Sequence, residues 1–276
     1  MALVPRKLPA KALQETLVFP PEIVKALDWR TSKYKTSDDW NNKRIMRIES
    51  QLVVDVSSLK YIKKIDLDNC SNIIDVSALC DVTYLYIFRC NKITNVNVLC
   101  NVETLLIGEL RNINDVSALG NVKNLSLWGC PNIVDVSALG NVKDLRFSQL
   151  PKVTDLSALS DVPSLSIEAC NGVTDISMLG TVKYLCITEC DNVTDVSALS
   201  TVLTLTLAWL PGVTDVSMLG TVLDLDIIKC HNIRDVSALK TCKKLHLGAC
   251  FGITDVSMLC SVKDFTIDGC TYVTKM

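Results

Sequence analysis

The chain has 276 residues, of which 49% are hydrophobic and only 5% aromatic, and its formal net charge is −2. Such a small net charge creates no strong field for nucleic acid or an anionic membrane surface, so neither is expected as a partner. No apolar run approaches the roughly 20 residues of a membrane-spanning helix, and the first residues lack the apolar stretch of a secretory signal. We therefore expect a cytoplasmic location.

Residues 1–50 do not repeat, and we predict that they form a partly helical N-terminal cap. Pro21 opens a segment that starts well as a helix, because proline is favoured at the first helical position. A solenoid has to hide the open end of its core, and a terminal cap does so. Residues 41–50 look like a degraded repeat, with Ile45 at an inward strand position and Arg47 where a second apolar residue is expected.

Residues 51–276 repeat with a period of 20 residues. One copy, residues 115–134, reads DVSALGNVKNLSLWGCPNIV. Aspartate opens nearly every copy, with Asn95 filling the one gap, and leucine follows four residues later each time, from Leu59 to Leu259. A fixed period of roughly 20–50 residues is typical of solenoids, so we expect eleven stacked coils.

Within one copy, Leu125 and Leu127 alternate with polar residues, which predicts a short strand with one buried face. The same positions of neighbouring copies would place such strands side by side in a parallel sheet. Two residues after the cysteine comes Asn or Gly, as at Asn132, and both tolerate a positive φ, so a sharp turn is predicted there. Asp135 then caps a short helical or 3-10 turn through amides two or three residues on, with Leu139 facing inward. Only about ten residues separate two strands, which is too few for a full crossover helix.

The pattern VxxLxLxxCxx[IV]TDVSxL resembles the leucine-rich repeat, specifically its cysteine-containing type. The Asp-[VI]-Ser-x-Leu segment is similar to the turn of internalin-type repeats, and the short unit is similar to repeat proteins of protists and giant viruses. The resemblance covers residues 51–276 and implies an α/β-type solenoid, mostly parallel β with short turns or 3-10 segments on the convex side. It implies a right-handed horseshoe or arc of 11 coils. The unit is shorter than that of the cysteine-containing family, so convex helices are not expected.

Eight of the thirteen cysteines share one repeat position: Cys70, Cys90, Cys130, Cys170, Cys190, Cys230, Cys250 and Cys270. Leu110, Leu150 and Leu210 occupy the same position in three other copies. A residue that is interchangeable with leucine is expected to be a small buried hydrophobe. A disulfide ladder is an alternative that a reducing compartment disfavours, and a zinc site would need a CxxC pair or a histidine cluster, both of which are missing.

The two halves of the repeat vary differently. DVSALGNVK occurs unchanged at 115–123 and 135–143, whereas the outward strand residues change freely from copy to copy. The fold constrains the turn half of the repeat, whereas the outward strand residues are free to vary and can serve recognition. We therefore predict a non-enzymatic scaffold that binds a protein of unknown identity through its concave β face.

The predicted binding patch is the place where aromatic residues converge. Tyr84, Tyr86 and Phe88 alternate along one strand, so all three are expected to face outward. Neighbouring strands add an apolar residue, a bare glycine between two aromatic walls, and a charged rim. The predicted partner-binding residues are Tyr84, Tyr86, Phe88, Arg89, Leu106, Gly108 and Trp128.

A metal-binding or enzymatic role is one alternative. His246 would face outward between Asp226 and Thr266, and we interpret this as a charge ladder across a polar sheet face. The repeated aspartates suggest calcium, but the glycine-rich nonapeptides of calcium-binding β-rolls are absent, so capping is preferred. No nucleophile with a base and no phosphate-binding loop is recognisable. We expect no enzyme activity, cofactor or metal.

Two further alternatives concern the ends of the chain. Residues 19–23, FPPEI, resemble the opening of an F-box, which implies a ubiquitin-ligase substrate receptor. At the other end, the coil around residues 264–268 has no cap and would present an unpaired strand. Such edges invite pairing, so a weak homodimer through this coil is expected.

Overall fold

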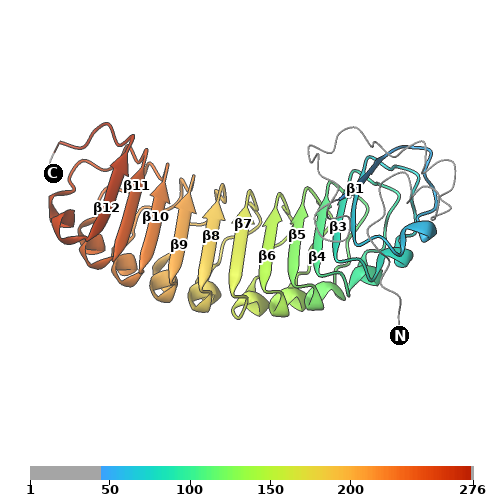
Figure 1. Cartoon of the computed structure of the whole chain (residues 1–276). Helices are drawn as coiled ribbons and strands as arrows, with labels where there is room; N and C mark the ends of the chain where they lie inside the picture. Colours follow the sequence, from blue (N-terminus) through green and yellow to red (C-terminus); the bar gives the residue numbers. More distant parts are fainter. Residues whose placement is uncertain (1–44, 275–276) are drawn as a thin grey trace, which may run out of the picture. The chain divides into compact units, whose positions relative to one another are not determined.

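The structure, a computed structural model, describes residues 45–274. The predicted helical cap and the F-box-like segment therefore lie outside the described residues. Two compact units divide the chain after Ser126. In each unit, strands of four or five residues alternate with short 3-10 turns (Figure 1). Over the range 45–274, no helix is long and apolar enough to cross a bilayer.

The first unit contains these elements: β1 (Met46–Glu49), η1 (Ser57–Leu59), β2 (Lys64–Asp68), η2 (Ser77–Leu79), β3 (Tyr84–Phe88), η3 (Asn97–Leu99), β4 (Thr104–Gly108) and η4 (Leu119–Asn121). Strand β5 (Asn124–Trp128) spans the boundary. The second unit contains η5 (Ser137–Asn141), β6 (Asp144–Ser148), η6 (Ser157–Leu159), β7 (Ser164–Glu168), η7 (Ser177–Thr181), β8 (Tyr184–Thr188), η8 (Ser197–Thr201), β9 (Thr204–Ala208), η9 (Ser217–Thr221), β10 (Asp224–Ile228), η10 (Ser237–Thr241), β11 (Lys244–Gly248), η11 (Ser257–Ser261) and β12 (Asp264–Asp268).

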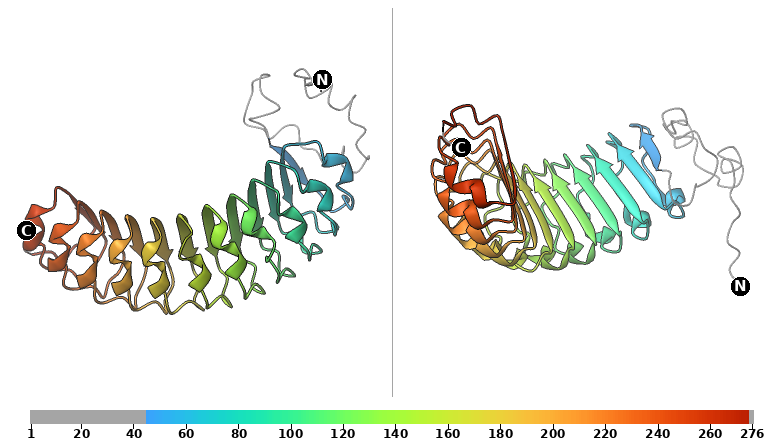
Figure 2. Two further views of the ribbon diagram at one scale, coloured as in Figure 1. Left: turned by 90° about the horizontal axis from the view of Figure 1, so that it is seen from below. Right: turned by 60° about the vertical axis from the view of Figure 1, so that its left-hand side comes forward.

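The strands follow one another in the sheet in sequence order, from β1 to β12. Pairs inside each unit are parallel and are offset by one repeat, as Asp226 opposite His246 illustrates. Along each strand the buried residues alternate with solvent-facing ones, for example Leu165 and Ile167 on β7. The turns of each unit gather on the side of the coils away from the strands (Figure 2). The predicted fold class, a parallel-β solenoid with 3-10 segments, is confirmed.

Every coil from β3 to β11 buries the same set of apolar positions. In the coil of β7 the buried residues are Val162, Leu165, Ile167, Cys170, Val173, Ile176 and Leu179. Phe147 is the largest fully buried side chain and occupies the inward strand position that Ile167 takes in the next coil. No polar or charged side chain of the described residues is buried. Each coil is thus stabilised by apolar contact with its two neighbours.

At β12 the inward residues Phe265 and Ile267 are only half-buried, whereas their equivalents on β11 are buried. The homodimer predicted through this coil stays a prediction.

The prediction for the degraded repeat was one residue out of register. Strand β1 pairs with β2, and its inward residues are Met46 and Ile48. Ile45, which was expected inward, is 46% exposed, and Arg47 lies on the solvent-facing side. Because Ile45 and Met46 are both apolar and adjacent, the sequence alone does not distinguish the two registers. The sheet therefore has twelve strands for eleven regular repeats.

The predicted position of the sharp turn was also wrong. The left-handed residue lies directly before the cysteine or leucine of the ladder position. Its φ is between 50° and 63°, at Asn69, Arg89, Glu109, Gly129, Gln149, Ala169, Glu189, Trp209, Lys229, Ala249 and Gly269. Its amide still bonds to the next strand, as the Arg89 N–H does to the Gly108 carbonyl at 3.1 Å. The sheet thereby holds non-glycine residues in a conformation that costs roughly 1–3 kcal/mol.

The Asn or Gly after the cysteine serves the stacking of coils. Asn72 donates from its side-chain amide to the Gln51 carbonyl of the preceding coil at 2.7 Å. At Gly172, a Cβ atom would lie 2.5 Å from the Pro151 carbonyl oxygen. In two other copies a lysine takes this position, and Lys92 and Lys152 donate to the side-chain oxygen of the asparagine one coil earlier.

The predicted aspartate caps are confirmed. Asp55 Oδ1 accepts the Ser57 N–H at 2.8 Å, and the equivalent bond, 2.8–3.0 Å long, occurs in all eleven repeats, with Asn95 in one of them. This bond pins the start of each 3-10 turn within its own coil. Between coils, the hydroxyls of Thr181, Thr201, Thr221 and Thr241 donate to backbone carbonyls one coil earlier at 2.6–2.7 Å.

Seven of the eight ladder cysteines are buried, as predicted, and Cys270 in the last strand is half-buried. No disulfide joins any of the thirteen cysteines. The Cys170 thiol donates to the Glu168 carbonyl at 3.3 Å. Burial raises the pKa of Cys190 and of Cys250 to about 12, so these thiols stay neutral at physiological pH.

Candidate protein-interaction surface

Strand β3 turns its aromatic side chains to the solvent-facing side of the sheet. Tyr84, Tyr86 and Phe88 are half-buried, whereas the two residues between them are buried. On β4, Leu106 lies opposite Tyr86, and Gly108 lies opposite Phe88. The predicted arrangement of these five residues is confirmed. Burial raises the pKa of Tyr84 and of Tyr86, so both phenols remain protonated.

The rings form one layer with a charged rim. The Tyr86 and Phe88 ring centroids are 6.0 Å apart with a tilt of 37°. The Arg89 guanidinium carbon lies 4.6 Å from the Phe88 ring centroid, and the same guanidinium donates to both carboxylate oxygens of Glu109 at 2.8 and 3.3 Å. This bidentate bond lowers the pKa of Glu109. Arg89 is thus fixed beside the Phe88 ring.

Trp128 belongs to the second unit, where it is half-buried on β5. Gly108 itself is buried. The predicted slot between Phe88 and Trp128 therefore stays a prediction.

Sequence reasoning missed the acidic side of this patch. Asp66 on β2 lies opposite Tyr86, and Asp68 lies opposite Phe88. Arg47 follows on β1, in register with Asp66. Burial, opposed by the Arg47 charge, raises the pKa of Asp66 to about 6. Alternation along β2 already placed both aspartates outward, but the wrong register of β1 concealed Arg47.

A second polar patch lies on β10, β11 and β12. His246 Nδ1 is 2.9 Å from Thr266 Oγ1, its Nε2 is 3.4 Å from Asp268 Oδ1, and Asp226 lies opposite on β10. His246, Thr266 and Asp226 line a groove of about 340 Å³ together with Asp224, Lys244 and Asp264. The predicted neighbours of His246 on the two flanking strands are confirmed. Over the described part of the chain, no group of three or more His, Cys, Asp or Glu side chains could hold a metal.

Several exposed aromatic residues occupy turns that the sequence analysis did not single out. The His231 and Phe251 rings stack at 4.6 Å and 2°, and Tyr272 meets Phe251 edge-on at 6.2 Å. Trp209 is 46% exposed, with the Lys229 amine 3.9 Å from its ring centroid. His231 and Phe251 share one repeat position, so comparing turn positions between copies would have revealed this stack.

Comparison with known proteins identifies the fold. No protein-family model and no curated protein matches the sequence. An internalin, InlF from Listeria monocytogenes str. 4b F2365, matches with a TM-score of 0.58 and 19% identity over 80% of this chain and 76% of that chain. This chain has a leucine-rich-repeat fold. The match supports the fold because it combines high coverage with the regular parallel strands, but 19% identity does not extend to function.

Two other leucine-rich-repeat structures match less closely. The functional domain of InlJ from Listeria monocytogenes, which includes a cysteine ladder, has a TM-score of 0.47 and 14% identity over 83% of this chain and 66% of that chain. TLR13, solved in complex with ssRNA13, has a TM-score of 0.43 and 17% identity over 85% of this chain and 43% of that chain.

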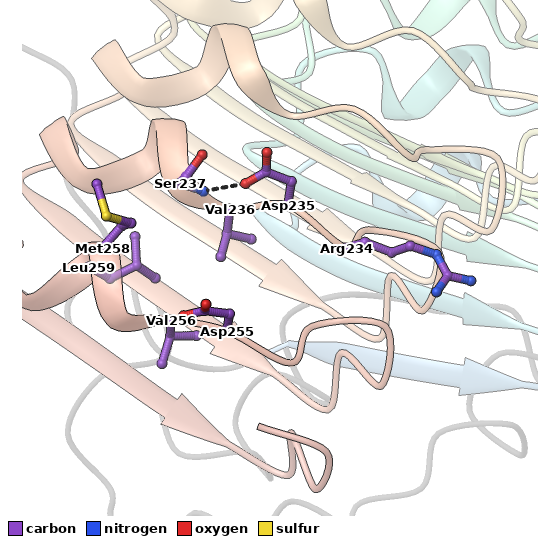
Figure 3. A pocket seen from close by; sticks show the side chains of 8 residues that line it. All are labelled: Arg234, Asp235, Val236, Ser237, Asp255, Val256, Met258 and Leu259. Atoms are coloured by element: carbon purple, nitrogen blue, oxygen red, sulfur yellow. Dashed lines mark hydrogen bonds between the residues drawn. The ribbon is translucent and has the colours of Figure 1, made fainter. Parts of the chain in front are cut away.

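The turn side of the leucine-rich repeats carries shallow hollows between consecutive coils. Three of them, of about 290, 380 and 350 Å³, are lined by equivalent repeat positions. In the hollow of Figure 3, the Ser237 amide bonds to Asp235, and Met258 and Leu259 form the opposite wall. Because these hollows recur with the repeat, they follow from coil stacking and do not mark a particular site.

Proposed function

We propose that this leucine-rich-repeat protein is a non-enzymatic scaffold that binds a protein partner through the solvent-facing side of β3 and β4. One observation carries the proposal: three aromatic side chains occupy successive outward positions of a single strand. In the other strands that lie wholly within one unit, no strand has more than one aromatic residue on that side. Aromatic residues and arginine dominate the binding energy of protein interfaces.

We also propose that the protein is located in the cytoplasm. No disulfide joins any of the thirteen cysteines, and this many thiols suit a reducing compartment such as the cytoplasm. Thiol quantification in rapidly lysed source cells would test it, and extensive disulfide formation in the cell would contradict it.

Partner capture from the source cell with variant baits tests the proposed surface. Tyr86→Ala is expected to weaken binding of the captured partner by about thirtyfold, which corresponds to the roughly 2 kcal/mol of a hot spot. Ser166→Ala is the matched control, because Ser166 takes the same repeat position on β7. Both variants should unfold near the wild-type temperature. Equal capture by the two variants would show that β3 is not the binding surface.

A further inference from the structure

Three carboxylates surround a single guanidinium next to the aromatic strand. The Arg47 Nη2 donates to Asp68 Oδ2 and lies 3.6 Å from Glu49 Oε2. Its Nε is 3.8 Å from Asp66 Oδ2, which is longer than a hydrogen bond. Arg47 therefore bonds to Asp68 and leaves Asp66 with a distant charge contact only.

The Oδ1 atom of Asp66 accepts no hydrogen bond from any described residue. This atom is buried, and only 19% of the Asp66 side chain is exposed. A buried carboxylate oxygen without a donor is costly, and the raised pKa of about 6 reflects that cost. A cation placed beside the exposed part of this side chain, on the solvent-facing side, would offset that cost.

The residues beside Asp66 suit a cation on an apolar stem. Tyr86 lies opposite Asp66 on the next strand, about 4.8 Å away, with Tyr84 on the same face. Leu106 follows opposite Tyr86. The face thus presents, in order, a carboxylate, an aromatic ring and an aliphatic side chain. Ring faces attract cations, and the stems of arginine and lysine pack on apolar surface.

We propose that this surface holds an arginine or lysine side chain of the protein partner, with its charged head on Asp66 and its stem across Tyr86 toward Leu106. The proposal rests on the proposed function and names the chemical group that the patch recognises. Arginine fits best, because its planar fork can donate to a carboxylate while it stacks on a ring. An acidic or phosphorylated group would meet Asp66, Asp68 and Glu49 and be repelled.

Selection of random linear peptides on the immobilised full chain tests the proposal. Peptides enriched on the wild type are expected to share an arginine or lysine next to an apolar residue. Asp66→Asn should lose that enrichment and weaken a selected peptide by about tenfold or more, the scale of a charge-assisted hydrogen bond. The variant keeps the shape of the side chain and removes a poorly solvated charge, so its fold is expected to persist. Asp226→Asn, at the same repeat position on β10, should select the same peptides as the wild type.

Acidity provides a second readout. A basic peptide requires ionised Asp66, so wild-type affinity should fall as the pH drops through about 6, and Asp66→Asn should not show this step. Lys64, Glu49, Asp68 and Arg47 face the same region and are present in both proteins, so a step that persists in the variant does not come from Asp66. Such a step, or enriched peptides without basic residues, would overturn the proposal.

The outcomes separate this proposal from the proposed function. If Tyr86→Ala abolishes peptide binding and Asp66→Asn does not, the surface stands and the cation proposal fails. If both variants bind as the wild type does, the surface itself is wrong. If no peptide is enriched, titration with N-acetylarginine amide decides: the Asp66 carboxyl carbon resonance should shift, whereas the uncharged citrulline analogue should leave it in place. If the Asp66 resonance does not shift when N-acetylarginine amide is added, the proposal is overturned.

Discussion

Gly180→Ala tests how closely the coils stack on their turn side. A Cβ atom at Gly180 would lie 2.4 Å from the Ala198 carbonyl oxygen of the next coil, so about 1 Å of backbone movement is needed to restore ordinary contact. The Gly180 carbonyl also accepts the Thr201 hydroxyl at 2.6 Å. Overpacking costs about 1–3 kcal/mol and a lost hydrogen bond about 1 kcal/mol. Reduced freedom of the unfolded chain returns about 0.4–1 kcal/mol, so we expect a net loss of roughly 1–3 kcal/mol.

Urea denaturation followed by circular dichroism measures this loss, and Ser200→Ala is the matched control. Ser200 takes the same repeat position one coil later, so its substitution should change stability by less than about 0.5 kcal/mol. The sign of the Gly180→Ala effect is decisive. If the coils had room for a methyl group, alanine would stabilise the protein through the unfolded state. A higher midpoint for Gly180→Ala, or equal midpoints for the two variants, would refute the close approach.

Four further outcomes are expected. Native thiol labelling should modify exposed Cys260 and spare buried Cys190 until denaturant is added, and equally fast labelling of both would contradict the burial of the ladder. Phe147→Ala should cost about 3–5 kcal/mol in a denaturation assay and Phe147→Leu less than about 1.5 kcal/mol, because other coils place Ile or Leu there. Serine amides lower the pKa of seven capping aspartates, so the stability they add above about pH 4 should be lost as the pH falls through their folded pKa, and an unchanged melting temperature in acid would refute this. Because the pKa of Asp66 is raised, Asp66→Asn should raise the melting temperature at neutral pH and not below about pH 4, and destabilisation at neutral pH would show that Asp66 has a favourable partner.

Periodicity made most of the fold predictable. The inward leucines, the aspartate caps and the neighbours of His246 all follow from positions that recur at a fixed spacing, because each copy constrains the next. Local preference failed where the sheet imposes a conformation: Arg89 and Glu109 adopt a left-handed φ that neither residue favours, since their amides must reach the next strand. The predicted register of strand β1 was wrong for a different reason, because this irregular copy occurs once and no second copy fixes its register.

The candidate surface was predictable in part. The outward direction of Tyr86 and its neighbour Leu106 follow from alternation and from the repeat length. The missing hydrogen bond of Asp66 could not be predicted, because it depends on which of three nearby carboxylates Arg47 contacts. A choice among nearly equivalent partners is settled by side-chain geometry, which no sequence pattern encodes.

The hydrogen bonds of the turn side have a consequence for how such a chain can change in length. The aspartate bond closes within a coil, and the threonine bond reaches one coil back, so both are defined by intervals of the repeat and not by absolute position. Excision of residues 161–180 would join Ser160 to Thr181 and leave every later coil with an equivalent set of donors and acceptors. The fold therefore tolerates the gain or loss of whole coils. Insertion of a single residue, in contrast, displaces the donors and acceptors of every later hydrogen bond in that coil. Unequal recombination between copies that share the turn half of the repeat would thus yield foldable products, and the distance between two features on the sheet face could evolve in steps of one strand.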